Sequence, residues 1–168
     1  MDANSKKIAL RMIPYGLFVL TAMAPDGQVT AATVNWVTQA SFNPPLVAVC
    51  IKADSHAHAL VKQTGVFALN ILGKGQGAQA FTFFKPAVVS GNTISGEPFH
   101  SGNNGAPILD NAPAFVECKV VEIAEGKGDH SVFIAEVTDA GVNTAPTGRP
   151  DDAILWLKDL GEKIFYGG

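Results

Sequence analysis

The feature that most constrains the fold of this chain is the length of its apolar runs. Runs rich in β-branched and aromatic side chains cover residues 16–23, 29–36, 46–51, 66–72, 114–123 and 131–142. Apolar runs of this length between turn-forming residues are typical of β-strands. Turn signals at 25–27 and 125–129 join neighbouring runs into hairpins. Helices are expected over residues 5–13, 55–64 and 77–85.

Strands therefore outnumber helices, and hairpins occur near both ends of the chain. This pattern predicts a mainly β, antiparallel barrel with short helices on it, in preference to a doubly wound α/β sheet. Residues 86–113 are rich in Gly, Pro, Ser and Asn, so a long irregular stretch is expected there. The 168 residues fit a single compact domain over 1–168.

The composition argues against several classes of protein. Hydrophobic residues make up 47% and charged residues 16%, which indicates a globular chain. A net charge of −3 without a Lys/Arg cluster argues against nucleic-acid binding and against a membrane surface. The apolar runs are too short to cross a bilayer, and the N-terminus lacks the apolar segment of a signal peptide. Cys50 and Cys118 lie in strand-like runs, so we expect buried free thiols and a cytoplasmic location.

Polar side chains are concentrated in residues 33–45, which read Thr-Val-Asn-Trp-Val-Thr-Gln-Ala-Ser-Phe-Asn-Pro-Pro. If this segment is one strand, Thr33, Asn35 and Val37 share one face. The two final prolines cannot continue a ladder, so a kink is expected that frees backbone amides near a ligand. The alternative is an ordinary half-buried strand, and composition alone favours that alternative.

A helix start follows this segment at Ser55. The first turn of a helix offers unpaired N–H groups and a partial positive charge, which together suit a phosphate. The Ser55 hydroxyl can cap the helix or donate to a phosphate oxygen, and plain capping is the commoner role. Lys52 and Lys85 can supply positive charge, although each alone is typical of a surface lysine.

A glycine-rich stretch, Gly73-Lys74-Gly75-Gln76-Gly77-Ala78, matches the dinucleotide fingerprint G-x-G-x-x-A. The second parallel strand that should follow about 20 residues later, with its acidic end, is missing from the pattern. We therefore interpret these glycines as a loop.

The histidines differ in what their positions predict. His56 and His58 are two apart in the expected helix and do not share a face, so no metal site is predicted. His130 stands at the end of the 126–129 turn, where a strand begins. A histidine at a barrel rim can supply a proton to a ligand near neutral pH, and an exposed loop histidine is the equal alternative.

Residues 33–45 resemble the T-x-N-x-x-T/S-x-x-S-x-D/N-P-P segment of the flavin reductase-like, FMN-binding split-barrel proteins. That family includes flavin reductases, ferric reductases and flavoredoxins. Further segments resemble the family in the same order, namely residues 15–21, 46–55, 66–72 and 128–137. The resemblance spans nearly the whole chain, and it implies an antiparallel, Greek-key-like split β-barrel.

The same resemblance implies a homodimer with FMN at the subunit interface and NAD(P)H as co-substrate. It assigns cofactor binding to Thr33, Asn35, Trp36, Val37, Thr38, Lys52, Ala53, Ser55 and Lys85, and a catalytic role beside the nicotinamide to His130. The implied activity is NAD(P)H-dependent flavin reduction, with a partner protein as one candidate acceptor. The alternatives are an electron-carrier FMN protein, a ferric reductase and a barrel without flavin.

Overall fold

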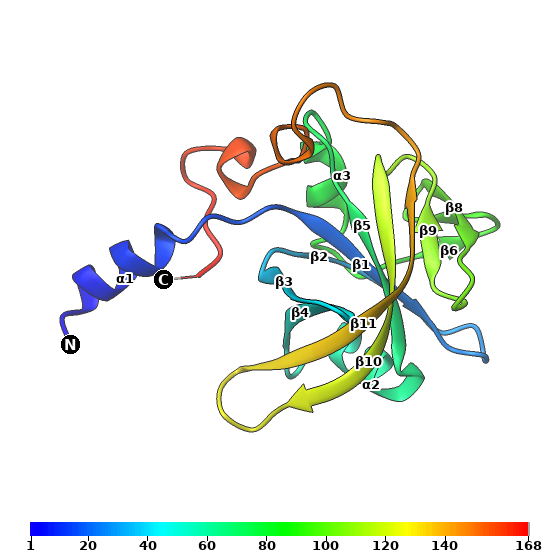
Figure 1. The fold of residues 1–168 in the computed structure, drawn as a ribbon, viewed down its shortest axis with the longest axis horizontal. Coiled ribbons are helices and arrows are strands. Elements are labelled where there is room, and N and C mark those ends of the chain that lie inside the picture. Colours follow the sequence, from blue (N-terminus) through cyan, green and yellow to red (C-terminus); the bar gives the residue numbers. More distant parts are fainter. Residues whose placement is uncertain (168) are drawn as a thin grey trace.

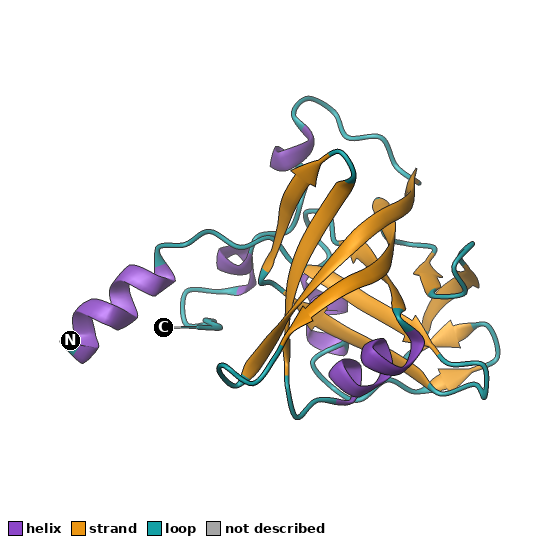
Figure 2. Ribbon diagram, turned by 60° about the horizontal axis from the view of Figure 1, so that its bottom comes forward, coloured by secondary structure: helices purple, strands orange, loops and turns teal. Residues whose placement is uncertain are grey.

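Within residues 1–167, which the computed structural model describes, seven strands form one antiparallel sheet. These strands are β1 (Phe18–Met23), β2 (Val29–Val34), β3 (Val37–Phe42), β4 (Pro45–Lys52), β5 (Val66–Ile71), β10 (Ala114–Ala124) and β11 (His130–Val142). They lie in the order β2-β1-β5-β10-β11-β4-β3. The sheet is strongly twisted and curled (Figures 1 and 2). The mainly β, antiparallel architecture predicted from the apolar runs is confirmed.

The chain crosses from one edge of this sheet to the other within two residues. β2 ends at Val34 and β3 begins at Val37, and these two strands are the edges of the sheet. So short a connection requires the edges to lie close together, because the three steps from Val34 to Val37 span at most about 10 Å. The sheet therefore curls into a barrel that is split between β2 and β3.

The prediction of a strand over residues 29–36 is wrong at its C-terminal end, because β2 ends at Val34. Thr33 pairs with Val19 on β1, whereas Val37 pairs with Val49 on β4, so the backbone turns a corner at Asn35. Alternation of faces does not carry across that corner. β3 ends before the prolines as expected, but the chain does not leave the sheet there: Asn43 and Pro44 form the turn, and Pro45 begins β4 opposite Phe42. This turn does not line the cavity described below.

Helix α2 (His56–Thr64) covers one end of the barrel, over β1 and β2. Ser55 caps its N-terminus by accepting a hydrogen bond from the backbone N–H of His58 (3.1 Å). Gly65, at φ +69°, ends it in the left-handed conformation that glycine adopts without strain. The buried side chains of α2 are Ala57, His58, Leu60 and Val61. The helix matches its predicted bounds.

The helix expected over 5–13 differs at both ends, ending at Arg11, and the helix expected over 77–85 differs at its end. Helix α1 (Ala3–Arg11) begins earlier because the carboxylate of Asp2, and not Ser5, accepts the capping hydrogen bond. Helix α3 (Gly77–Thr82) ends three residues before Lys85. α1 buries none of its residues and projects from the barrel (Figures 1 and 2).

The composition predicted an irregular stretch over residues 86–113, and the structure differs from this prediction. These residues contain a second antiparallel sheet of β6 (Val89–Ser90), β7 (Thr93–Ile94), β8 (Glu97–Ser101) and β9 (Pro107–Leu109). Asn70 on β5 ties this sheet to the barrel, since its Oδ1 accepts from the Leu109 N–H (2.8 Å) and its Nδ2 donates to Val19 O (3.1 Å). The strands were missed because they are short and owe their stability to this tertiary contact.

The last segment of the chain returns to the barrel. It contains the 3₁₀ turns η1 (Pro150–Asp152) and η2 (Leu157–Leu160). Between them, Leu155 donates to Leu72 O (2.8 Å) and accepts from the Leu17 N–H (2.9 Å). These hydrogen bonds hold the segment against the ends of β1 and β5. Residues 161–167 follow η2, and we call them the C-terminal strap.

The barrel interior is filled by apolar side chains from the sheet and α2. Its buried members include Leu20, Val49, Ile51, Leu60, Val61, Phe67, Leu69, Cys118 and Phe133. A second cluster lies between β1, α3 and the C-terminal segment. Among the described residues, no helix has the length and hydropathy that a membrane crossing requires.

Candidate functional site

A cavity of about 520 Å³ lies in the split of the barrel. Its walls come from edge strand β2, the end of β4, the first turn of α2 and residues 83–87 after α3. The walls are mostly apolar, and the exceptions gather at Asn35, at the start of α2 and at His130. A concave apolar site with a few polar groups is the usual form of a small-molecule or cofactor site.

Asn35 lies beside this site and carries a buried donor that no described residue satisfies. It lines the cavity at the end of β2 with only 5% of its surface exposed. Its Nδ2 is buried, and within residues 1–167 it has no hydrogen-bond partner. A buried N–H without an acceptor costs about 1–3 kcal/mol. A ligand that brings a hydrogen-bond acceptor into the cavity would remove this cost.

The first turn of α2 supplies further donors to the same cavity, which Ser55, His56 and Ala57 line. The Ser55 Oγ accepts the His58 N–H as the helix cap, and its own hydroxyl hydrogen is free to be donated outward. The N–H groups of His56 and Ala57 belong to the helix turn that has no intrahelical acceptors. This arrangement can hold an anion such as a phosphate.

Two lysines bring positive charge to the cavity. Lys52 ends β4, and its Nζ lies 3.0 Å from Asp54 Oδ1, with both side chains largely exposed. The hydrogen bond to Asp54 and the charge of its carboxylate raise the pKa of Lys52. Lys85 lies in the loop after α3 and is exposed. Both lysines can therefore balance the charge of an anion held at the start of α2.

His130 opens β11 at the rim of the cavity, beside Lys52 in the sheet. Its Nδ1 lies 2.9 Å from Asp129 Oδ1, and its Nε2 lies 2.8 Å from the Tyr166 hydroxyl. The hydrogen bond to His130 lowers the pKa of Asp129, so its carboxylate is an acceptor and Nδ1 carries the proton. Nε2 lies within hydrogen-bond distance of the hydroxyl of Tyr166, whose pKa is raised by burial.

Trp36 forms an aromatic cluster at the same rim. Its ring centroid lies 4.6 Å from that of His130 and 5.3 Å from that of Tyr166. Its Nε1 is, with Asn35 Nδ2, a buried donor that no described residue accepts. Two orphaned N–H groups thus occur on consecutive residues at the corner between β2 and β3.

The structure brings together six of the ten residues predicted for the site and places four outside the cavity lining. Those lining it are Thr33, Asn35, Lys52, Ser55, Lys85 and His130; those outside are Trp36, Val37, Thr38 and Ala53. Val37 and Thr38 lie outside because β3 leaves the cavity at the corner. Ala53 instead donates its N–H to Asp129 O (2.9 Å). The binding roles of all ten residues stay predictions.

Sequence reasoning missed other residues that line the cavity, among them Cys50, His56, Tyr166 and most of residues 83–87. Cys50 shares a strand face with Lys52, so alternation along β4 could have indicated it. Burial raises the pKa of the Cys50 thiol, which argues against a reactive thiolate. Tyr166 carries no local signal, because only the path of the strap brings it to His130.

Comparison with known proteins adds to this geometry. Residues 10–159 match the model of the flavin reductase like domain. The chain belongs to the flavin reductase-like family. Among curated family members, it is 36% identical over 135 residues to the reductase component of a 4-nitrophenol 4-monooxygenase/4-nitrocatechol 2-monooxygenase of Rhodococcus opacus, covering 80% of this chain and 68% of that one. It is 32% identical over 150 residues to an NADH-dependent flavin reductase of Pseudomonas fluorescens, covering 89% and 85%.

Solved structures of the family agree with this fold. An NADH:FAD oxidoreductase of Streptomyces globisporus superposes with a TM-score of 0.72 at 26% identity, covering 92% of this chain and 87% of that one. The cavity of this chain combines apolar walls, a buried amide at Asn35 and a helix N-terminus beside two lysines, a combination that suits a ring system carrying a phosphate.

Proposed function

We propose that this chain is an NAD(P)H-dependent flavin reductase that holds FMN in the split of its barrel. The observation that carries the proposal is the buried, unpartnered amide of Asn35 in a cavity that the N-terminus of α2 also lines. A relative named as an NADH-dependent flavin reductase and a structure named as an NADH:FAD oxidoreductase support the reaction. The helix N-terminus favours a flavin with a terminal phosphate, and we therefore infer FMN.

Each part of the site has a role in this proposal. Asn35 donates to a polar edge of the flavin, while Ser55, the first amides of α2, Lys52 and Lys85 hold the phosphate. Bound FMN supplies the hydride acceptor, and the cofactor performs that chemistry. His130, oriented by Asp129, positions the nicotinamide or gives up a proton at Nε2. The apolar walls exclude water from the two stacked rings.

Anaerobic mixing of the FMN-loaded protein with NADH or NADPH tests the reaction. Bleaching of the yellow colour within the dead time of manual mixing is expected. Persistence of the colour would favour an electron carrier instead. A colourless protein that FMN does not reconstitute would favour a barrel without flavin and would refute the proposal.

The catalytic role of His130 needs a matched control, and His100 provides one. Both histidines are bonded to an aspartate through Nδ1, His130 to Asp129 and His100 to Asp110, but His100 lies on β8 outside the cavity lining. His130→Ala should lower NAD(P)H oxidation by about 100-fold, the lower range of acid–base contributions. His100→Ala should leave it unchanged. Equal turnover in the two variants would remove His130 from the mechanism.

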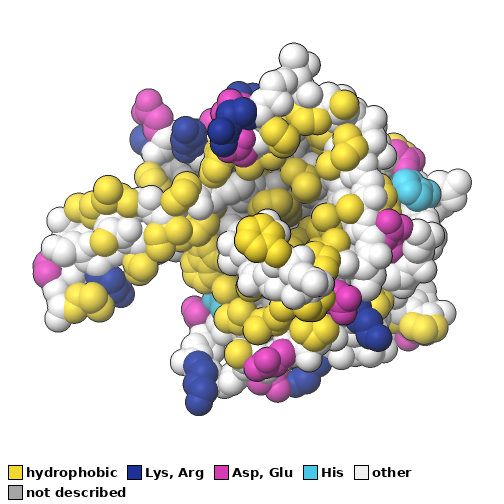
Figure 3. Space-filling model, viewed as in Figure 1, with side chains coloured by type: hydrophobic (Ala, Val, Ile, Leu, Met, Phe, Trp, Pro, Cys, Tyr) yellow, Lys and Arg dark blue, Asp and Glu magenta, His cyan; other side chains and the backbone are white. Residues whose placement is uncertain are grey.

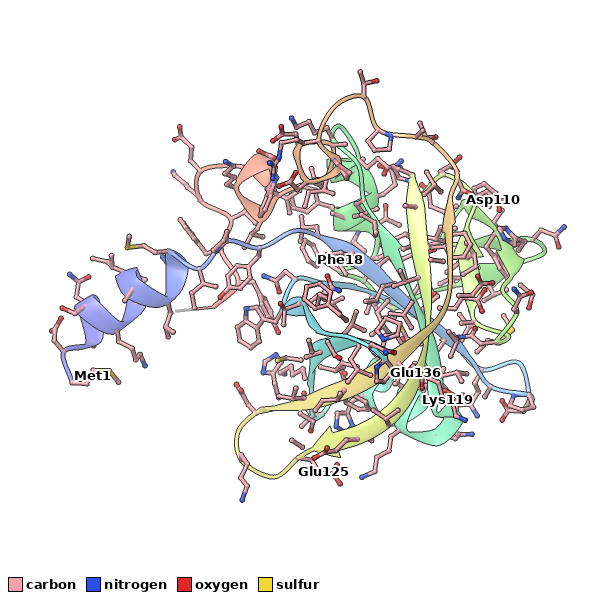
Figure 4. All side chains as sticks on the ribbon, viewed as in Figure 1. Met1, Phe18, Asp110, Lys119, Glu125 and Glu136 are labelled. Atoms are coloured by element: carbon pink, nitrogen blue, oxygen red, sulfur yellow. The ribbon has the colours of Figure 1, made fainter. Side chains whose placement is uncertain are left out.

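We infer that the protein acts as a homodimer. The support is an apolar surface that the described residues leave exposed: Ile8, Leu10, Met12 and Ile13 on or next to α1 are 42–78% exposed, and Phe42 on β3 is 92% exposed. Hydrophobic side chains cover α1 and the centre of the same face in Figure 3, and the side chains near Met1 extend away from the barrel in Figure 4. Such patches mark interaction sites.

Light scattering with size-exclusion chromatography measures the oligomeric state. Ile8→Glu should convert the dimer to a monomer, whereas Val121→Glu, equally exposed on β10, should leave the dimer intact. A wild-type monomer at micromolar concentration would refute the inference.

We further infer that reduced flavin leaves for a second protein. The support is the relative from Rhodococcus opacus, which is named as the reductase component of a monooxygenase. Release would show as multiple turnovers of added free FMN in the absence of other acceptors. The cytoplasm stays the expected location, because both cysteines are free thiols.

A further inference from the structure

The C-terminal strap, residues 161–167, closes the rim of the cavity with few contacts. It follows η2 without regular secondary structure, and Phe165 and Tyr166 are 52% and 44% exposed. Arg11 holds it from α1: its Nε donates to Gly167 O (3.3 Å), and its guanidinium lies 4.2 Å from the centre of the Phe165 ring. A segment without regular secondary structure, whose Phe165 and Tyr166 side chains are about half exposed, opens at a lower free-energy cost than the strands of the barrel.

Tyr166 takes up the accessible nitrogen of His130. The Tyr166 hydroxyl lies 2.8 Å from Nε2, and Asp129 engages Nδ1 on the other side of the ring. With both ring nitrogens engaged, His130 has no free position for a ligand while the strap is closed. The Tyr166 ring also lines the cavity itself, so an aromatic group already occupies the rim beside His130.

The strap covers Trp36 without offering an acceptor to its indole N–H. A Cβ built on Gly167 would lie 3.1 Å from Trp36 Cζ2 and 3.6 Å from its Nε1, so the strap lies directly on the indole. Yet no described residue accepts the buried Nε1–H. The closed strap therefore buries a donor without satisfying it, which a tightly fitted structural contact would avoid.

We propose that Tyr166 is a gating residue whose ring occupies the seat of the nicotinamide beside Trp36 and His130, so that the nicotinamide enters by displacing the strap. This inference rests on the proposed function. The nicotinamide ring then takes the place of the Tyr166 ring. Its carboxamide offers an acceptor to the indole N–H of Trp36, which no described residue accepts, and a hydrogen-bond partner to His130 Nε2. Arg11 tunes the gate from outside the cavity.

The closed state should weaken the apparent affinity for the nicotinamide. If the strap is closed about ten times as often as it is open, apparent affinity falls about tenfold. That factor corresponds to about 1.4 kcal/mol. With saturating FMN, Tyr166→Ala should therefore lower the KM for NAD(P)H and raise kcat/KM about tenfold. Tyr166→Phe keeps the ring and loses the bond to His130, so it should give a smaller effect.

Arg11→Ala provides an independent variant, because Arg11 does not line the cavity but holds the strap through Gly167 and Phe165. It should also lower the KM. Strap opening has its own readout in a Trp156→Phe background, where Trp36 is the remaining tryptophan. Acrylamide quenching of its fluorescence should increase about twofold or more in Tyr166→Ala and increase in Arg11→Ala.

Several results would overturn the inference. Unchanged quenching in Tyr166→Ala would show that the strap does not cover Trp36 in solution. Increased quenching with an unchanged KM, or with a lower kcat, would show that Tyr166 is a structural or positioning residue and not a gate. If the wild-type protein neither binds FMN nor oxidises NAD(P)H, the proposed function fails, and with it the assignment of the nicotinamide as the group that displaces the strap. The quenching measurement would still show whether the strap covers Trp36.

Discussion

Replacing Asn35 with leucine should strengthen the flavin-free protein and weaken its binding of flavin. The amide Nδ2 of Asn35 is buried without a partner among the described residues, so the flavin-free state carries the cost of an unsatisfied donor. Leucine has a similar size and no polar atom. Asn70 is the matched control, because it is also buried but donates to Val19 O and Thr21 Oγ1 and accepts from the Leu109 N–H.

The magnitudes follow from these contacts. Removing the orphaned donor should raise the free energy of unfolding by about 1–2 kcal/mol, less any packing penalty. Asn70→Leu removes three hydrogen bonds and leaves buried partners unpaired, so it should lower the free energy of unfolding by about 3–5 kcal/mol. In a chain of this size, 1 kcal/mol shifts Tm by about 2–4 °C. Losing one hydrogen bond to the ligand should weaken FMN binding about threefold to tenfold.

Urea denaturation of the flavin-free variants and fluorescence titration with FMN measure both quantities. The reasoning predicts opposite signs for the two effects of Asn35→Leu. Destabilisation of the flavin-free protein comparable to that of Asn70→Leu would show that the Asn35 amide is satisfied in the absence of ligand. An unchanged affinity for FMN would show that Asn35 does not contact the flavin. Either result refutes the argument.

Three further outcomes test the packing. Gly141→Ala on β11 places a Cβ against the Phe115 ring on β10 and should lower the free energy of unfolding by about 1–3 kcal/mol in urea denaturation; a neutral result would contradict the packing described. Glu117→Gln should lower it by about 1.5–3 kcal/mol, because the buried carboxylate accepts two backbone N–H groups from the 103–104 loop; a loss under about 0.5 kcal/mol would argue against that role. Cys118 should resist iodoacetamide at pH 8, because burial and the nearby charge of Glu117 raise the pKa of its thiol to about 12. The thiol stays protonated below that pKa, so the resistance should persist as the pH rises from 8 to 10. Mass spectrometry that shows labelling of the folded protein as fast as in urea would contradict this prediction.

The elements that sequence reasoning located well are those whose cause is local. Helix α2 begins at a serine cap and ends at a glycine with φ +69°, and both signals lie within the helix's own sequence. Strands β10 and β11 are long, apolar and joined by a polar turn. By contrast, β6 to β9 were missed because their short strands depend on contact with Asn70 and the barrel.

The candidate site shows the same division. Ser55, Lys52 and His130 were found because a helix cap, a strand end and a turn are each visible in the sequence. The corner at Asn35 was missed, because it arises where two edge strands take different partners, β1 for β2 and β4 for β3. That corner sends Val37 and Thr38 away from the cavity, and no described residue accepts from the side-chain N–H groups of Asn35 and Trp36.

The amino-acid sequence by itself therefore determined the strand-rich class, the hairpins and the capped helix, since hydrophobic period, turn residues and caps act over a few neighbouring positions. Only the tertiary structure decided the register between distant strands, the corner at Asn35 and the placement of Tyr166 on His130, 36 positions away in the chain. Contacts between residues far apart in sequence depend on how all strands close together, and no local pattern encodes that closure.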